Sequence, residues 1–223
     1  EQCDKCQNRI KTEGLHDEHE LQSYFIKRIE KFLNSKGKQI IGWDEILEGG
    51  LAPGATVQSW RGFEGAAEAA KSGHQAIVSP TSHAYFDYAI HDIDMEKVYD
   101  FEPVPEGLSV AEAALILGGE CNMWSERAPQ HLVDSKVFPR ILAMAEVLWS
   151  DSTNRNYDEF TSRVQQQYKI LDKLGVKYGF EKPPLVVSTK VVGRELMVEM
   201  DSYDDEMEIY YALNQDNFTL YEY

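Results

Sequence analysis

Short apolar runs separated by amphipathic stretches make up most of the chain before residue 184. Four of these runs are typical of buried strands, and the far end of each one turns polar or aromatic. They cover residues 39–43, 55–60, 75–79 and 115–119. Because helical patterns lie between the runs, their order predicts βα units that share a parallel sheet.

Helical periodicity is clearest at residues 17–36 and 157–174. The first stretch begins with Asp17 and Glu20, spaced like a capping box, and stops at Gly37. Its expected apolar face consists of Leu21, Phe25, Ile29, Phe32 and Leu33. A third stretch, residues 131–149, contains Pro139, which predicts a kink or a break. We expect Trp149, at the end of that stretch, to lie in the core.

Residues 80–107 form a long irregular connection with one short helix expected at 95–99. Connections of this length inside a compact domain usually carry function. Beyond residue 184 the residue composition changes, because β-forming residues dominate at 185–192, 195–200 and 207–213. This tail is expected to form a short antiparallel β segment of a second module.

Composition and charge restrict the partners of the chain. With 223 residues, 43% of them hydrophobic and 27% charged, a folded globular domain is expected. The formal net charge of −16 argues against nucleic acid or an anionic membrane as a partner. No apolar run approaches the roughly 20 residues of a membrane span. Because the first residue is not Met, we expect a piece of a longer protein, whose compartment this piece leaves unknown.

Three cysteines are too few for a disulfide framework. Cys3 and Cys6, followed by His16 and His19, superficially resemble a zinc cluster. The histidine spacing is tighter than in zinc fingers, so zinc stays a minor alternative and we expect no metal and no cofactor.

Four ordered motifs at the ends of the predicted strands carry a family resemblance. They are Gly42-Trp43-Asp44-Glu45, Ser59-Trp60-Arg61-Gly62, Tyr85-Phe86-Asp87-Tyr88 and Gly118-Gly119-Glu120-Cys121-Asn122-Met123-Trp124-Ser125-Glu126. In this order they resemble the second half of the catalytic barrel of β-N-acetylhexosaminidases of glycoside hydrolase family 20. The resemblance implies an α/β fold, a partial (β/α)₈ TIM barrel with about strands five to eight in residues 1–179. Residues 180–223 would begin a C-terminal β-module.

The resemblance also implies an activity for the parent protein. Members of this family are retaining exo-acting enzymes that remove terminal N-acetylglucosamine or N-acetylgalactosamine, with the acetamido oxygen of the substrate as nucleophile. The expected partner is therefore a glycan or oligosaccharide that ends in an N-acetylhexosamine. A secreted, periplasmic, cell-surface or lysosomal parent is expected.

Six residues would contact the sugar if the resemblance holds. Three tryptophans would line a pocket for the acetamido methyl group and the sugar ring, namely Trp43, Trp60 and Trp124. Tyr85, the candidate catalytic residue, would donate its hydroxyl to the acetamido oxygen. Asp87 and Glu126 would accept hydrogen bonds from sugar hydroxyls, Glu126 at the 4- and 6-positions.

One family motif is absent. The orienting Asp and the acid Glu of the family share a His-x-Gly-Gly-Asp-Glu motif, which does not occur in this chain. Asp44 and Glu45 are not expected to replace that pair, because neighbouring residues of an extended strand point to opposite faces. We therefore expect this chain to be inert alone. A non-catalytic carbohydrate-binding module and a self-associating module stay open as alternatives, since a half barrel exposes strand edges that pair.

Overall fold

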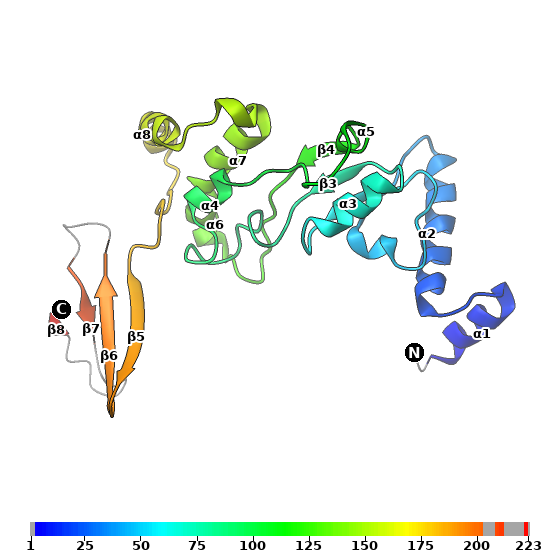
Figure 1. Cartoon of the computed structure of the whole chain (residues 1–223), viewed down its shortest axis with the longest axis horizontal. Coiled ribbons are helices and arrows are strands. Elements are labelled where there is room, and N and C mark those ends of the chain that lie inside the picture. The colour runs from blue at the N-terminus through cyan, green and yellow to red at the C-terminus, as the bar shows by residue number, and fades with distance from the viewer. Residues whose placement is uncertain (1–2, 203–207, 212–220, 223) are drawn as a thin grey trace.

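A parallel sheet lies at the centre of the computed structural model, which describes residues 3–202, 208–211 and 221–222 (Figure 1). The four strands lie in sequence order, β1-β2-β3-β4. Their bounds are β1 (Ile41–Trp43), β2 (Thr56–Ser59), β3 (Ala76–Val78) and β4 (Ile116–Gly119). Each strand falls within one of the four predicted apolar runs, so the α/β class with a parallel sheet is confirmed.

The register of the sheet aligns the strand ends. Trp43 pairs with Gln58, Gln58 with Ile77, and Ile77 with Gly118. Because all three pairings are parallel, the carboxyl ends of the strands meet at one edge of the sheet. The segments that follow the strands therefore start side by side, and these segments contain the four motifs.

One helix packs on the middle strands of the sheet. Helix α3 (Glu64–Lys71) is rich in alanine and packs on β2 and β3. Its Ala66, Ala69 and Ala70 are at most 1% exposed, because small side chains let the helix approach the strands closely. Ile41 of β1 and Leu117 of β4 are 55% and 54% exposed. The two edge strands of the sheet thus present apolar side chains to solvent.

Two helices precede the sheet. Helix α1 (Asp4–Glu13) was not predicted, whereas α2 (Glu18–Asn34) was. The predicted apolar face of α2 is confirmed at Leu33, which packs against the core, but is wrong at Phe25 and Phe32, which are 58% and 59% exposed. The inner face instead buries Ser23 and Glu30, which bond to the loop after β1. Ser23 Oγ donates to a carbonyl oxygen there, and Glu30 accepts from the amide of Gly54 at 2.6 Å.

Several short helices follow β3. The predicted α4 (Met95–Tyr99) is capped by Asp94, and α5 (Val110–Ala113) precedes β4. As predicted, the stretch around Pro139 is broken rather than straight, because the preceding Phe138 is extended. The pieces are η2 (Gln130–Leu132), α6 (Val133–Val137) and α7 (Arg140–Trp149). Trp149 is 91% exposed, so its expected place in the core is wrong.

The chain then continues through η3 (Ser152–Asn154) into the predicted helix α8 (Tyr157–Leu174). Helix α8 ends at Gly175, whose φ of 69° lies in the left-handed region that glycine adopts without strain. Phe160 and Val164 of α8 belong to the same hydrophobic core as Met144 and Val147 of α7. Among the described helices, none combines the length and the apolar character needed to cross a membrane.

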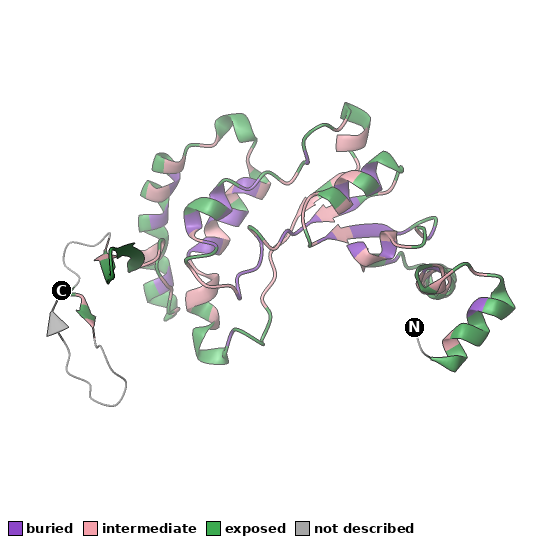
Figure 2. Cartoon of the chain, turned by 60° about the horizontal axis from the view of Figure 1, so that its bottom comes forward, coloured by how far each residue is buried: buried purple, intermediate pink, exposed green. Residues whose placement is uncertain are grey.

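The C-terminal part contains antiparallel pairs, as predicted. Strand β5 (Val186–Val192) pairs with β6 (Glu195–Asp201), and β7 (Tyr210–Tyr211) pairs with β8 (Tyr221–Glu222). The strand expected at 207–213 lies partly outside the described residues. Figure 2 shows that β5 and β6 are almost entirely exposed, while buried residues concentrate around the parallel sheet and α7.

Candidate active site

One cavity opens where the four parallel strands end. Its volume is about 350 Å³, within the range of small-molecule sites. The cavity is lined by Trp43, Glu45, Trp60, Tyr85, Trp124 and Glu126. Five of the six residues predicted to contact a sugar therefore line one cavity, and they come from the ends of all four strands.

The aromatic rings of the cavity form two pairs. Trp43 and Trp124 lie with ring centroids 6.1 Å apart and planes inclined by 46°. Trp60 and Tyr85 lie 6.3 Å apart and are inclined by 39°. Trp43 and Trp124 are 37% and 42% exposed, whereas Tyr85 is only 6% exposed. The cavity thus has an accessible aromatic mouth and a buried phenol, an arrangement suited to the apolar face of a sugar ring with a polar group held inside.

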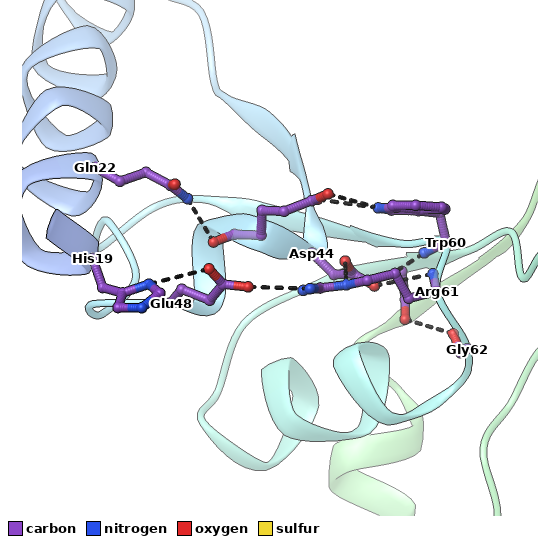
Figure 3. Close-up of polar contacts among 9 residues, drawn as sticks. His19, Gln22, Asp44, Glu48, Trp60, Arg61 and Gly62 are labelled. Atoms are coloured by element: carbon purple, nitrogen blue, oxygen red, sulfur yellow. Dashed lines mark hydrogen bonds and ion pairs between the residues drawn. The ribbon is translucent and has the colours of Figure 1, made fainter. Parts of the chain in front are cut away.

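The segment after β1 holds the backbone of the segment after β2 through hydrogen bonds to Asp44. The chain leaves β1 through a 3₁₀ turn, η1 (Asp44–Leu47), and the carboxylate of Asp44 is 2% exposed. This carboxylate accepts hydrogen bonds from the backbone amides of Trp60 and Arg61 at 3.2 and 3.3 Å. It also accepts from Arg61 Nε at 2.6 Å, as Figure 3 shows. Asp44 is therefore a structural residue that holds the backbone of the Trp60 motif.

Glu45 is the lining residue to which the sequence reasoning gave no binding role. Its two carboxylate oxygens accept from the indole Nε1 of Trp60 at 3.2 and 3.1 Å. Its backbone carbonyl accepts from the side-chain amide of Gln22 in α2 at 2.8 Å (Figure 3). Asp44 and Glu45 do point apart, but the cause is the 3₁₀ turn rather than the strand alternation that the sequence suggested. No sequence signal gives this direction.

Tyr85 is held by a short extension of the sheet. It forms an isolated parallel bridge with Asn122, flanked by backbone hydrogen bonds of 2.8 Å from Phe86 and 2.7 Å to Ala84. Burial raises the pKa of Tyr85 to about 12, although a hydrogen bond with the Trp124 side chain lowers it slightly. The phenol therefore remains protonated at neutral pH and can donate a hydrogen bond into the cavity.

Asp87 does not line the cavity, although it was predicted to contact the sugar. Its side chain is buried, and Oδ1 has no hydrogen-bond partner among the described residues. The backbone carbonyls of Asp87 and Tyr88 accept from Lys136 Nζ in α6 at 2.7 and 3.4 Å. The sugar contact of Asp87 thus stays a prediction, and the observed role of this residue is within the loop.

A buried arginine secures the loop that carries Tyr85. Arg140, at the start of α7, is 2% exposed and donates to the carbonyls of Phe86, Ile93 and Lys136. Its guanidinium also lies 4.9 Å from the centre of the Phe86 ring. Burial lowers the pKa of Arg140 to about 10, so the group is charged at neutral pH. This one side chain connects the loop after β3 to the helical layer.

The described residues contain no cluster of ligands that would support the minor zinc alternative. In residues 3–202, 208–211 and 221–222, no group of three or more His, Cys, Asp or Glu side chains is arranged to hold a metal ion. Cys3, Cys6 and Cys121 are free. The cavity at the strand ends therefore consists of aromatic walls, one phenol and two carboxylates.

Comparisons with known proteins identify the family of this chain. The profile of the glycosyl hydrolase family 20 catalytic domain matches residues 1–152. A β-hexosaminidase of Porphyromonas gingivalis is 40% identical over 194 residues, which cover 81% of this chain and 25% of that protein. Human β-hexosaminidase subunit beta is 28% identical over 72% of this chain and 30% of its own length. The chain thus spans less than a third of either relative.

Solved structures of the same family share the fold. The exo β-N-acetylglucosaminidase of Vibrio harveyi, in complex with N-acetylglucosamine, superposes with a TM-score of 0.68 at 26% identity, covering 79% of this chain and 30% of that one. The chitobiase of Flavobacterium johnsoniae gives a TM-score of 0.68 at 35% identity, covering 76% and 27%. Since the catalytic-domain profile covers well over half of the residues, the chain belongs to glycosyl hydrolase family 20.

Proposed function

We propose that this chain is the second half of the catalytic barrel of a retaining exo-β-N-acetylhexosaminidase. In this proposal residues 1–179 supply about strands five to eight of a (β/α)₈ barrel, and residues 180–223 begin a C-terminal β-module. The observation that carries the proposal is a cavity of about 350 Å³ at the ends of four consecutive parallel strands. Active sites of (β/α)₈ barrels lie at this end of the strands.

The aromatic side chains suit a substrate that supplies its own nucleophile. The acetamido oxygen of an N-acetylhexosamine would attack the anomeric carbon, and the leaving oxygen would take a proton from a general acid. Trp43, Trp60 and Trp124 would enclose the acetamido methyl group and one face of the ring, which favours a near-attack geometry. Exclusion of water by these walls would strengthen the polar contacts within the cavity.

Two polar groups of the cavity have separate roles in this reaction. The protonated phenol of Tyr85 would donate to the acetamido oxygen as the oxazolinium-like intermediate forms. Glu126 would accept hydrogen bonds from the 4- and 6-hydroxyls of the sugar. A site with such a carboxylate rejects analogues without those hydroxyls, because the carboxylate would be left without its partner.

The chain alone is proposed to be catalytically inert. It contains no His-x-Gly-Gly-Asp-Glu motif, and Glu45 and Glu126 are the carboxylates that line the cavity. Both oxygens of Glu45 accept from Trp60, which leaves Glu45 poorly placed to protonate a leaving group. The general acid would come from a preceding part of the parent protein.

Hydrolysis of an aryl N-acetyl-β-glucosaminide tests this function. The assay compares the 223-residue chain with a version extended upstream through the acidic motif of the parent. A thiazoline mimic of the cyclised intermediate is titrated into both. Turnover and inhibition in the extended protein alone are expected. Absence of turnover in both would refute the hexosaminidase assignment, and turnover by the short chain would refute the missing acid.

A further inference from the structure

Glu45 lines the cavity, but the family resemblance assigned it no contact with the sugar. We propose that Glu45 is a positioning residue, which fixes the indole ring of Trp60 as one wall of the cavity. The proposal rests on the proposed function in one respect, namely that the cavity holds a sugar. The structural evidence for the proposal is a hydrogen bond from the indole N–H of Trp60 to the Glu45 carboxylate. The indole nitrogen lies 3.2 and 3.1 Å from the two carboxylate oxygens.

Trp60 is held at two separate points by consecutive acidic residues. The buried Asp44, the first residue of the 3₁₀ turn, accepts a hydrogen bond from the backbone amide of Trp60 at 3.2 Å. Glu45, on the cavity side of the same turn, accepts from the ring. The backbone contact alone would leave the two side-chain torsions of Trp60 free to change, whereas the ring contact restricts both. Both contacts come from the same 3₁₀ turn, because Asp44 and Glu45 belong to η1.

Glu45 is itself anchored from outside the cavity. Gln22 of α2 donates its side-chain amide to the Glu45 carbonyl at 2.8 Å, which ties the 3₁₀ turn to the preceding helix. A residue of a binding site keeps its position only when the residues that hold it are themselves fixed. The bond from Gln22 to Glu45 therefore also helps to fix the Trp60 ring. The chain of contacts thus runs from Gln22 through Glu45 to Trp60.

The position of the Trp60 ring sets one dimension of the cavity. Its centroid lies 6.3 Å from the ring of Tyr85, the proposed hydroxyl donor. A rotated indole would either close this space or open it to water, and either change would disturb a bound acetamido group. A hydrogen bond to a charged acceptor is about twice as strong as a neutral one, so Glu45 is well suited to hold a ring that would otherwise rotate.

The test is the indole N–H resonance of Trp60 in ¹H–¹⁵N spectra of the 223-residue chain, assigned with Trp60→Phe. Glu45→Ala removes the acceptor, and an upfield shift or broadening of this resonance is expected. Glu45→Gln keeps one neutral oxygen acceptor and should restore most of the signal. Glu48→Gln is the matched control, since Glu48 belongs to the same loop but bonds to Arg61 and His19. An unchanged Trp60 resonance in Glu45→Ala would overturn the proposal.

A binding measurement gives the functional consequence. The dissociation constant of the N-acetylglucosamine-derived thiazoline is expected to rise roughly tenfold in Glu45→Ala and less in Glu45→Gln. Equal affinity of Glu45→Ala and the unchanged chain would overturn the role of Glu45 in the sugar site. If the unchanged chain does not bind the thiazoline, the sugar-site function of this chain fails. The Trp60 resonance then still decides whether Glu45 positions the ring.

Discussion

The indole rings of Trp43 and Trp124 lie 6.1 Å apart, although these residues belong to the motifs of the two edge strands, β1 and β4. Three strand spacings separate the edges of a flat sheet by about 14 Å. The two rings therefore lie less than half as far apart as the edges of a flat sheet would. The mouth of the cavity is made jointly by the first and the last motif, so a change in either one alters the same opening.

Replacement of Asp44 is expected to destabilise the fold. Asp44→Ala would leave the amides of Trp60 and Arg61 without their buried acceptor, at a cost of ~1–3 kcal/mol in the free energy of unfolding. Glu68→Ala, on the exposed side of α3, should stay within about 0.5 kcal/mol. Urea denaturation of the two variants measures the difference. Equal midpoints for Asp44→Ala and the unchanged chain would contradict the structural role of this carboxylate.

Arg140→Met tests the attachment of the Tyr85 loop. The variant leaves the carbonyls of Phe86, Ile93 and Lys136 without a buried donor, so we expect a loss of about 3 kcal/mol or more in the free energy of unfolding. Hydrogen exchange in the loop after β3 should also accelerate. Arg163→Met removes an arginine whose side chain is 53% exposed and serves as the control. Matching stabilities of the two variants would show that the buried contacts contribute little.

The titration of Tyr85 has a defined direction. Burial raises its pKa from 10.0 to about 12, so the folded protein keeps this proton where the unfolded chain loses it. The stabilising contribution of Tyr85 is therefore complete below about pH 10 and declines as the pH rises toward 12. The difference in tyrosinate absorbance between the unchanged chain and Tyr85→Phe measures this ionisation. A difference signal centred near pH 10 would mean that the phenol is open to water.

Gly65→Ala tests the close approach of α3 to the first two strand ends. An added Cβ would lie 2.9 Å from the Cβ of Asp44 and 2.9 Å from the Oγ of Ser59, both in buried residues. Alanine gains about 1 kcal/mol over glycine inside a helix, but overpacking of this kind costs ~1–3 kcal/mol. We expect a net loss of stability in thermal unfolding. A raised melting temperature would show that the helix moves aside at little cost.

Self-association is proposed for the isolated chain, because the edge strands carry exposed apolar side chains. Leu117→Lys places a charge on β4 at a site that is 54% exposed, so it should weaken association without unfolding the chain. Val110→Lys, 91% exposed on α5, is the control. Light scattering at micromolar protein measures the mass of each variant. A monomeric unchanged chain would refute the proposal, as would equal association of both variants.

The order of the β and α elements could be predicted from local patterns. All four parallel strands fall inside predicted apolar runs, and α8 matches its predicted bounds. Continuous apolar runs indicate buried strands, and capping residues and glycine indicate helix ends. Both signals lie within a few neighbouring residues of the chain. The family resemblance that the four motifs carry implied a shared pocket, and the structure places Trp43, Trp60, Tyr85, Trp124 and Glu126 around one cavity.

Only the tertiary structure decided which way particular side chains point. The sequence by itself determined an amphipathic α2, but the loop after β1 needed Ser23 and Glu30 as bonding partners, so these polar residues face inward and Phe25 and Phe32 lie outside. The 3₁₀ turn likewise directs Glu45 to Trp60. Such directions depend on partners far away in the chain, and periodicity within one element contains no information about them.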